Sequence, residues 1–137
     1  MNALVQSMPG TFPLDENRDF LRESEWVILK LLCRSIDSLA MADADELSSA
    51  SGGQLSPERC LQLINIVRIS NLPGLGTWIA RLLVEAGMDE HALLTLTAED
   101  VTSRINMHAG YPICNQATAH AIANLQTAWN DERHKDI

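Results

Sequence analysis

The stretch S-N-L-P-G-L-G-T at residues 70–77 places a proline and two glycines between two apolar segments with helical spacing. Proline interrupts a helix, and glycine adopts backbone angles that other residues avoid. The stretch therefore predicts a tight hairpin between two helices. Its role has two interpretations: its backbone amides hold a phosphate, or it is a corner that joins two packed helices.

Helical periodicity predicts the segments on both sides of this hairpin. Apolar residues recur at helical intervals in T-W-I-A-R-L-L-V-E-A, which follows the hairpin, and Gly87 is expected to close that helix. The same spacing occurs in S-E-W-V-I-L-K-L-L-C-R, and we expect a buried helix to begin at Glu23. The side chains of this first helix that are expected to face the core are Trp26, Ile28, Leu29, Leu31 and Leu32.

Residues that cap helices mark further elements. Ser56 followed by Pro57 is the expected cap and first residue of a helix that runs to about Ile69. A final helix is expected from about Asn115 to Trp129. No segment of the chain predicts a strand.

Two shorter helices are predicted by capping boxes, in which a cap residue and an acid three residues later exchange hydrogen bonds. Asp43 is paired in this way with Glu46, and Thr97 with Asp100. Both pairs lie after a longer helix, so the two parts of the chain share an order of elements.

The chain also aligns with itself, which predicts an internal duplication. The segment L-P-G-L-G at residues 72–76 falls on F-L-R-E-S at residues 20–24, so only the second unit is expected to form a glycine hairpin. The other matched pairs are Trp26 with Trp78, Leu31 with Leu83, Asp37 with Asp89, Leu39 with Leu93, Leu47 with Val101, Ser56 with Cys114 and Ile64 with Ile122.

These signals predict an all-α fold, a compact bundle of five to seven short helices. We expect an irregular N-terminal arm at 1–22, either docked or loose, and a single helical domain at 23–130. Within the domain, the pseudo-repeats cover about 23–69 and 70–130, and a charged tail that is expected to fray follows at 131–137.

The charge of the chain limits its partners. With 18 acidic and 10 basic residues, the formal net charge is −8, and a field of that sign repels nucleic acid and anionic membranes. The longest apolar runs are far shorter than a membrane span, and the N-terminus lacks a basic signal region. We therefore expect a cytoplasmic protein without membrane insertion.

The cysteines and histidines predict no catalytic or metal site. The three cysteines are odd in number, form no CxxC pair and have apolar neighbours, which is typical of buried, reduced thiols. The histidines are spread over different expected elements, without metal-ligand spacing or a paired carboxylate. We expect no cofactor and no enzyme activity. These residues are Cys33, Cys60, Cys114, His91, His108 and His120.

The order of a helix, L-P-G-L-G, a second helix and G-M-D resembles the helix-hairpin-helix motif. Over residues 23–130 the pattern is similar to a bacterial family of tandem helix-hairpin-helix domains of unknown function. The resemblance implies that the turn's amides and the second helix's N-terminus can hold a phosphate. In this sequence, it implies that Gly74 and Gly76 supply the turn, that Leu72 and Leu75 anchor it, and that Ala80 allows close helix packing.

The sequence departs from the DNA-binding form of that motif. DNA-binding members carry Lys or Arg just after the second glycine, where this chain has Thr77, Trp78 and Ile79. The nearest cations are Arg68 before the hairpin and Arg81 one turn after it. Together with Arg59 they form a small positive segment that contains no acid.

Partner binding has its own candidate residues. Trp78 is either a partner anchor or, like Trp26, a core residue, and we expect both to lie in the core. Residues 104–114 predict either an exposed contact loop or a loop tucked against the last helix. The candidate partner-binding residues are Trp78, Met88, Met107, His108 and Tyr111, with Pro112 beside them.

We therefore expect a non-catalytic protein–protein interaction module, an adaptor or regulatory protein whose acidic rim steers a basic protein partner. The alternative is nucleic-acid binding through the backbone amides of the hairpin, aided by two arginines. The residues of that alternative are Gly74, Leu75, Gly76, Thr77, Arg68 and Arg81. The sequence does not determine the oligomeric state.

Overall fold

The computed structural model describes the backbone of residues 19–135 and the side chains of residues 19–132, and the described residues contain helices and no strands. The all-α prediction is confirmed. Most of the expected N-terminal arm lies outside the described residues. The elements are α2 (Glu23–Leu31), the 3₁₀ helix η1 (Asp37–Met41), α3 (Ala44–Ala50), α4 (Pro57–Ser70), α5 (Thr77–Glu85), α6 (Glu90–Thr95), α7 (Ala98–Ala109) and α8 (Gln116–Lys135).

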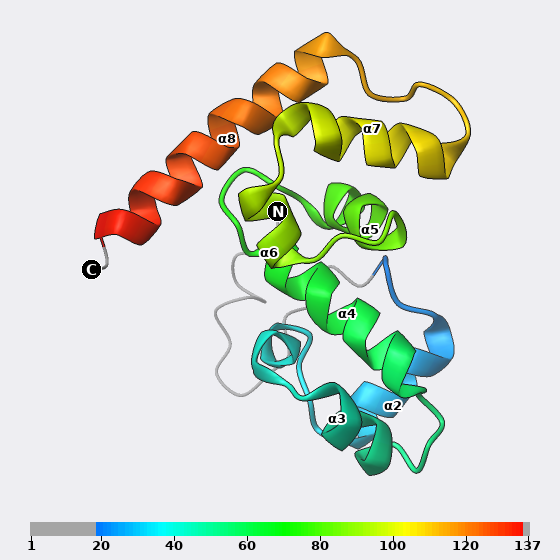
Figure 1. Cartoon of the computed structure of the whole chain (residues 1–137). Coiled ribbons are helices and arrows are strands. Elements are labelled where there is room, and N and C mark those ends of the chain that lie inside the picture. The colour runs from blue at the N-terminus through cyan, green and yellow to red at the C-terminus, as the bar shows by residue number, and fades with distance from the viewer. Residues whose placement is uncertain (1–18, 136–137) are drawn as a thin grey trace, which may run out of the picture.

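Helix α4 is the central element of the bundle. It packs against α3 and η1 on one side and against α5 and α6 on the other. Figure 1 shows α2 and α3 around one end of α4, α5 and α6 around the other end, and α7 on the far side of α5. Helix α8 packs on α7 and α6, and its C-terminal part leads away from α7.

The helices begin where the capping residues predict. Asp43, Ser56 and Thr97 each accept a hydrogen bond from the backbone N–H three residues later, so these three caps are confirmed. The second half of the first box is wrong, because the Glu46 carboxylate binds Arg34 Nη2 at 2.6 Å instead. Helix α8 continues through residues 131–135, where the sequence predicted a frayed tail.

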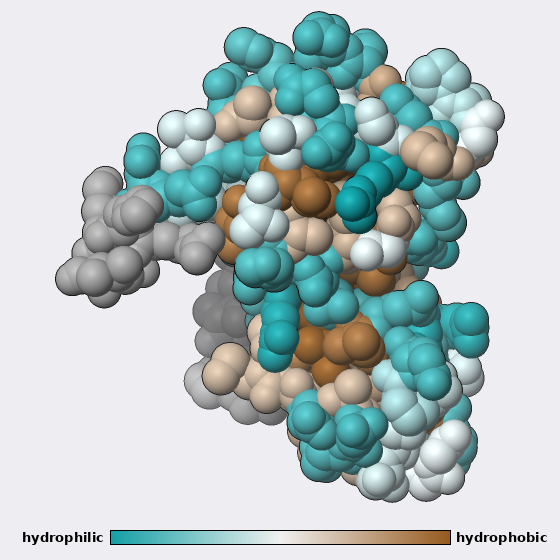
Figure 2. All heavy atoms as spheres, viewed as in Figure 1, coloured by the Kyte–Doolittle hydropathy of each residue, from teal (hydrophilic) through white to brown (hydrophobic). Residues whose placement is uncertain are grey.

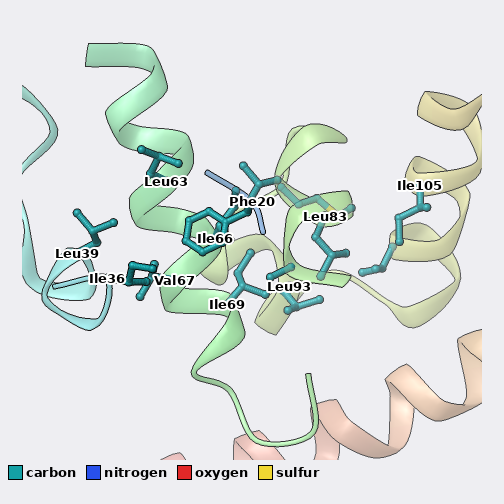
Figure 3. Close-up of a cluster of buried hydrophobic side chains, with 14 of the residues drawn as sticks. Phe20, Ile36, Leu39, Leu63, Ile66, Val67, Ile69, Leu83, Leu93 and Ile105 are labelled. Carbon is teal, nitrogen blue, oxygen red and sulfur yellow. The ribbon is translucent and has the colours of Figure 1, made fainter. Parts of the chain in front are cut away.

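A single apolar cluster joins the two ends of the bundle. Figure 3 shows side chains of α4, including Ile66 and Ile69, between Leu39 of η1 and Leu83 of α5. On the face shown in Figure 2, apolar residues gather along the middle of the molecule and polar residues cover its two ends. The core is therefore continuous from the first half of the chain to the second.

The buried face of α2 differs in part from the predicted one. Leu29 is fully buried, whereas Leu31 is 78% exposed, so its predicted place in the core is wrong. Trp26 is half-buried, with Lys30 Nζ 4.1 Å from the centre of its ring. Helix α2 carries apolar residues on most of its circumference, and periodicity alone does not select the buried face.

The two halves share several features in the same order. Asp43 caps α3 and Thr97 caps α7, while Leu39 and Leu93 are buried in the elements before them. Residues with positive φ follow both α2 and α5: Cys33 at 58° and Gly87 at 89°. The internal duplication itself stays a prediction.

A buried ion pair attaches α2 to α4. Arg59 donates to both carboxylate oxygens of Glu25, at 2.7 and 3.0 Å, and also to the carbonyl oxygen of Phe20 at 3.1 Å. The Arg22 N–H donates to Glu25 Oε1 at 2.8 Å. Burial by itself would raise the pKa of Glu25, but the hydrogen bonds from Arg59 and Arg22 outweigh it and the pKa is lowered.

We predict that Glu25→Gln destabilises the fold by about 3 kcal/mol at neutral pH, because it leaves the Arg59 guanidinium without its partner charge. The lowered pKa means that the ionised carboxylate stabilises the fold above its unfolded-state pKa and that this contribution is lost as the pH falls. When the pH is lowered, the free energy of unfolding should therefore decrease less for the variant than for the wild type. Urea unfolding at about pH 7 and about pH 3 measures both effects, because the loss occurs between the unfolded-state pKa of a glutamate, about 4.3, and the lower pKa in the fold.

Glu46→Gln is the matched control, because it breaks a second carboxylate–arginine pair whose Glu46 side chain is 55% exposed. Exposed pairs contribute little to stability, so this variant should unfold almost as the wild type does. Equal effects of the two substitutions would contradict the assigned role of Glu25.

Candidate functional site

The predicted hairpin lies between α4 and α5. Only one of its two glycines has a backbone conformation that requires glycine. Gly74 has φ +94°, and a Cβ at this position would lie 2.5 Å from Leu125 Cδ2 of α8. Gly76 has φ −100° and ψ 175°, an extended conformation that any residue adopts, and a Cβ there would meet no atom within 4 Å. The expectation that both glycines are needed for backbone angles is therefore wrong for Gly76.

Helix α8 is fastened over this turn by two side chains. The indole Nε1–H of Trp129, which is 3% exposed, donates to the carbonyl oxygen of Pro73 at 2.8 Å. The amide of Gln126 donates to the carbonyl oxygens of Leu93 and Leu96, both at 2.8 Å, at the end of α6. The position of α8 is thus set by the hairpin and by α6 together.

This arrangement leaves an apolar cavity of about 280 Å³, which we call the α5–α8 groove. Helices α5 and α8 form its walls, and α7 and the segment before α8 complete it. No lining residue is charged. The lining residues are Leu75, Trp78, Ile79, Leu82, Ile105, Ile113, Cys114, Thr118, Ala121, Ile122 and Leu125.

Trp78 is the most exposed large side chain of the groove, with 68% of its surface accessible. Its predicted place in the core is wrong, because α5 turns Ala80, Leu83 and Val84 inward instead. The alternative interpretation of Trp78, as an anchor for a partner, is compatible with this exposure. An accessible indole beside an apolar cavity is typical of a binding site.

The other candidate partner-binding residues are divided by the structure. Met107 is 81% exposed and Tyr111 63% exposed, and His108 is exposed in the last turn of α7. Met88 is only 2% exposed and packs in the core, so its prediction as binding surface is wrong. It follows Gly87, whose turn directs the chain back into the bundle.

The arginines expected to help the hairpin hold a phosphate have protein partners. Arg68 Nε donates to the carbonyl oxygen of Ala40 at 2.8 Å, and Arg81 Nε to Glu85 Oε2 at 3.1 Å. Arg59 is held by Glu25. Each of the three arginines of the positive segment therefore binds a different oxygen-bearing group of the protein.

The sequence contains a signal for this site that motif patterns do not capture. Residues 69–80 and 105–130 contain no Asp, Glu, Lys or Arg. They form the hairpin, the start of α5, the end of α7 and α8 up to Asn130, and they include every groove residue except Leu82. The acidic rim that we expected is therefore absent from the lining of the groove, and a scan for uncharged runs would have located this face.

Thiol and metal chemistry have no centre in the groove. Burial raises the pKa of Cys114, and burial together with the charge of Glu25 raises that of Cys60, so both thiols stay protonated at neutral pH. Cys33 is exposed, contrary to the expectation of a buried thiol. Among the described side chains, residues 19–132, no three His, Cys, Asp or Glu are grouped to hold a metal ion.

Two searches concern the helices of residues 19–135 and the sequence as a whole: one for a membrane-spanning helix and one for matching proteins. None of the helices in the described part of the chain has both the length and the apolar character needed to cross a membrane. Comparison with protein-family models, with curated proteins and with solved structures found no match. The resemblance to the tandem helix-hairpin-helix family stays a prediction.

The two hairpin glycines give a matched pair of variants. We predict that Gly74→Ser lowers the free energy of unfolding by about 1–3 kcal/mol, because it strains a positive-φ position and its Cβ collides with Leu125. Gly76→Ser should leave stability unchanged or slightly raised, since the serine supplies the N-cap side chain that α5 lacks. Urea unfolding of both variants measures the difference, and a destabilised Gly76→Ser beside a tolerated Gly74→Ser would contradict this account.

Proposed function

We propose that the protein is a non-catalytic interaction module that binds a polypeptide segment in the α5–α8 groove. The observation that carries the proposal is Trp78, which is 68% exposed at the edge of an uncharged apolar cavity of about 280 Å³. Covering such a side chain removes apolar surface from water, which contributes about 25 cal/mol per Å². A tryptophan in this position therefore favours association with an apolar partner surface.

The chemistry of the lining supports packing as the source of affinity. Apart from the indole of Trp78, its polar side chains are limited to Thr118 and the protonated thiol of Cys114, and Thr118 already bonds Asn115. With no ionised group in the groove, neither proton transfer nor charge recognition has a suitable side chain there. A bound segment would be selected by the shape and size of its apolar side chains.

Nucleic-acid binding, the alternative function, has less support. The affinity of proteins for nucleic acid comes largely from Lys and Arg side chains that neutralise phosphates. The hairpin and the groove lie in stretches without such residues, and Arg68 and Arg81 are engaged with protein oxygens. The alternative predicts a complex that is lost on nuclease treatment or at high salt.

Two exposed residues of α8 test the proposal. Ala121 lines the groove, whereas Thr127 lies on a different side of the same helix and does not line it. We predict that Ala121→Arg, which places a long charged side chain in the groove, reduces recovery of a bound polypeptide at least about tenfold, equivalent to about 1.4 kcal/mol. Thr127→Arg should leave recovery unchanged.

The measurement is affinity capture from a nuclease-treated extract of the source cells, with circular dichroism to show that both variants are folded. Equal recovery with both variants would place the binding surface elsewhere. Recovery of only nuclease-sensitive material with the wild type would favour the nucleic-acid alternative and contradict the proposal.

A further inference from the structure

We propose that the polypeptide bound in the α5–α8 groove is a second copy of this chain, so that two copies pair face to face. This inference rests on the proposed function and names its partner. It follows from the distribution of charge, from the shape of the face and from the side chains that surround it.

The distribution of charge favours a second copy over a charged partner. Each chain has a formal net charge of −8, so two copies repel each other over most of their surfaces. Residues 69–80 and 105–130, which include every groove residue except Leu82, contain no Asp, Glu, Lys or Arg, and the exposed charges that follow Trp78 on α5, Arg81 and Glu85, neutralise each other in an ion pair. Two copies can approach there with the least repulsion, whereas a basic partner would be better matched by the acidic elements elsewhere.

The shape of the face suits pairing with itself. A two-fold interface brings the same patch of both subunits together, so the patch must contain both a projection and a cavity that receives it. Trp78 supplies the projection and the groove supplies the cavity, and both are on one face because Trp78 belongs to the lining. In a two-fold pair, each copy would insert Trp78 toward the groove of the other.

The surroundings of the groove extend this contact surface. Tyr111, which is largely exposed, lies two residues before the lining residue Ile113. Met107 is about 200° from Ile105 around α7, so it lies on the other side of that helix. On α8 the exposed side chains near the groove are small, which permits a neighbouring helix to approach closely. These small residues are Ala117, Ala121 and Asn124. Exposed aromatic side chains beside an uncharged apolar cavity are typical of the centre of an interface.

The chain offers a matched control for this face. Leu31 is 78% exposed at the end of α2, a helix of nine residues like α5, and it does not line the groove. Replacing Trp78 or Leu31 with Arg therefore makes the same kind of change, an exposed apolar side chain to a cation. Neither substitution removes a buried side chain, so both variants should fold.

Sedimentation equilibrium of the purified chain over a range of concentrations tests the inference. The wild type should reach twice the mass of one chain as its concentration rises. The dissociation constant of the pair should not increase when the salt concentration is raised, because the contact is apolar. Trp78→Arg and Ala121→Arg should sediment as single chains at concentrations where Leu31→Arg is still paired, with a loss of affinity of at least about tenfold.

Three outcomes would overturn the inference: a wild type that stays a single chain throughout, a pair that survives Trp78→Arg, or a pair that Leu31→Arg disrupts equally. Failure of the inference is distinguishable from failure of the proposed function. If the wild type is a single chain but captures a different polypeptide that Ala121→Arg loses, the groove binds polypeptide and the second copy is the wrong partner. If Ala121→Arg affects neither pairing nor capture, both proposals fail.

Discussion

The contact between the hairpin and α8 is the constraint on which the candidate site depends. Gly74 has no side chain, and Leu125 occupies the space that a Cβ would take. Trp129 then bonds the carbonyl oxygen of Pro73, and Gln126 bonds the last carbonyls of α6. These contacts set α8 opposite α5, and the groove exists because the two helices are held apart at that position with Trp78 at its edge.

The first half of the chain supports this arrangement from the other side of the core. Helix α4 contacts elements of both halves, and its Arg59 holds α2 through the buried carboxylate of Glu25. An ion pair of this kind, with Glu25 buried and Arg59 partly buried, adds little net stability, but removing Glu25 is costly because the partly buried Arg59 charge is left without its partner. The ion pair therefore determines the position of α2 on α4 more than it stabilises the fold. The hairpin follows the C-terminal end of this same helix α4.

Local signals in the sequence predicted the parts of the fold that depend on neighbouring residues. The caps at Asp43, Ser56 and Thr97 and the hairpin at residues 70–77 are where short-range hydrogen bonds and backbone restrictions place them. The buried face of α2 was predicted poorly, since Leu29 and Leu31 are equally apolar and only the tertiary fold, which buries Leu29 in the core cluster, decides between them. The Glu25–Arg59 pair joins residues 34 positions apart, and no local pattern reports such a contact.

The candidate site shows the same division. The sequence singled out Trp78, Met107 and Tyr111, which are exposed, but it also singled out Met88, which the turn after α5 buries. Trp78 was expected in the core because it aligns with Trp26 in the predicted duplication, and its exposure follows from the face that α5 presents to α4. The uncharged segments at residues 69–80 and 105–130 can be identified in the sequence. That they line one groove could not be predicted, because it depends on α8 folding back beside α5.

The central claim is that the α5–α8 groove is the surface through which this protein contacts another polypeptide. The most direct measurement is photo-crosslinking in the source cells, with a photoreactive amino acid placed at position 121 or, on a different side of the same helix, at position 127. We predict a discrete crosslinked polypeptide from position 121, at twice the mass of the chain if the partner is a second copy, and none from position 127. Equal crosslinking from both positions, or no protein product from position 121, would contradict the claim.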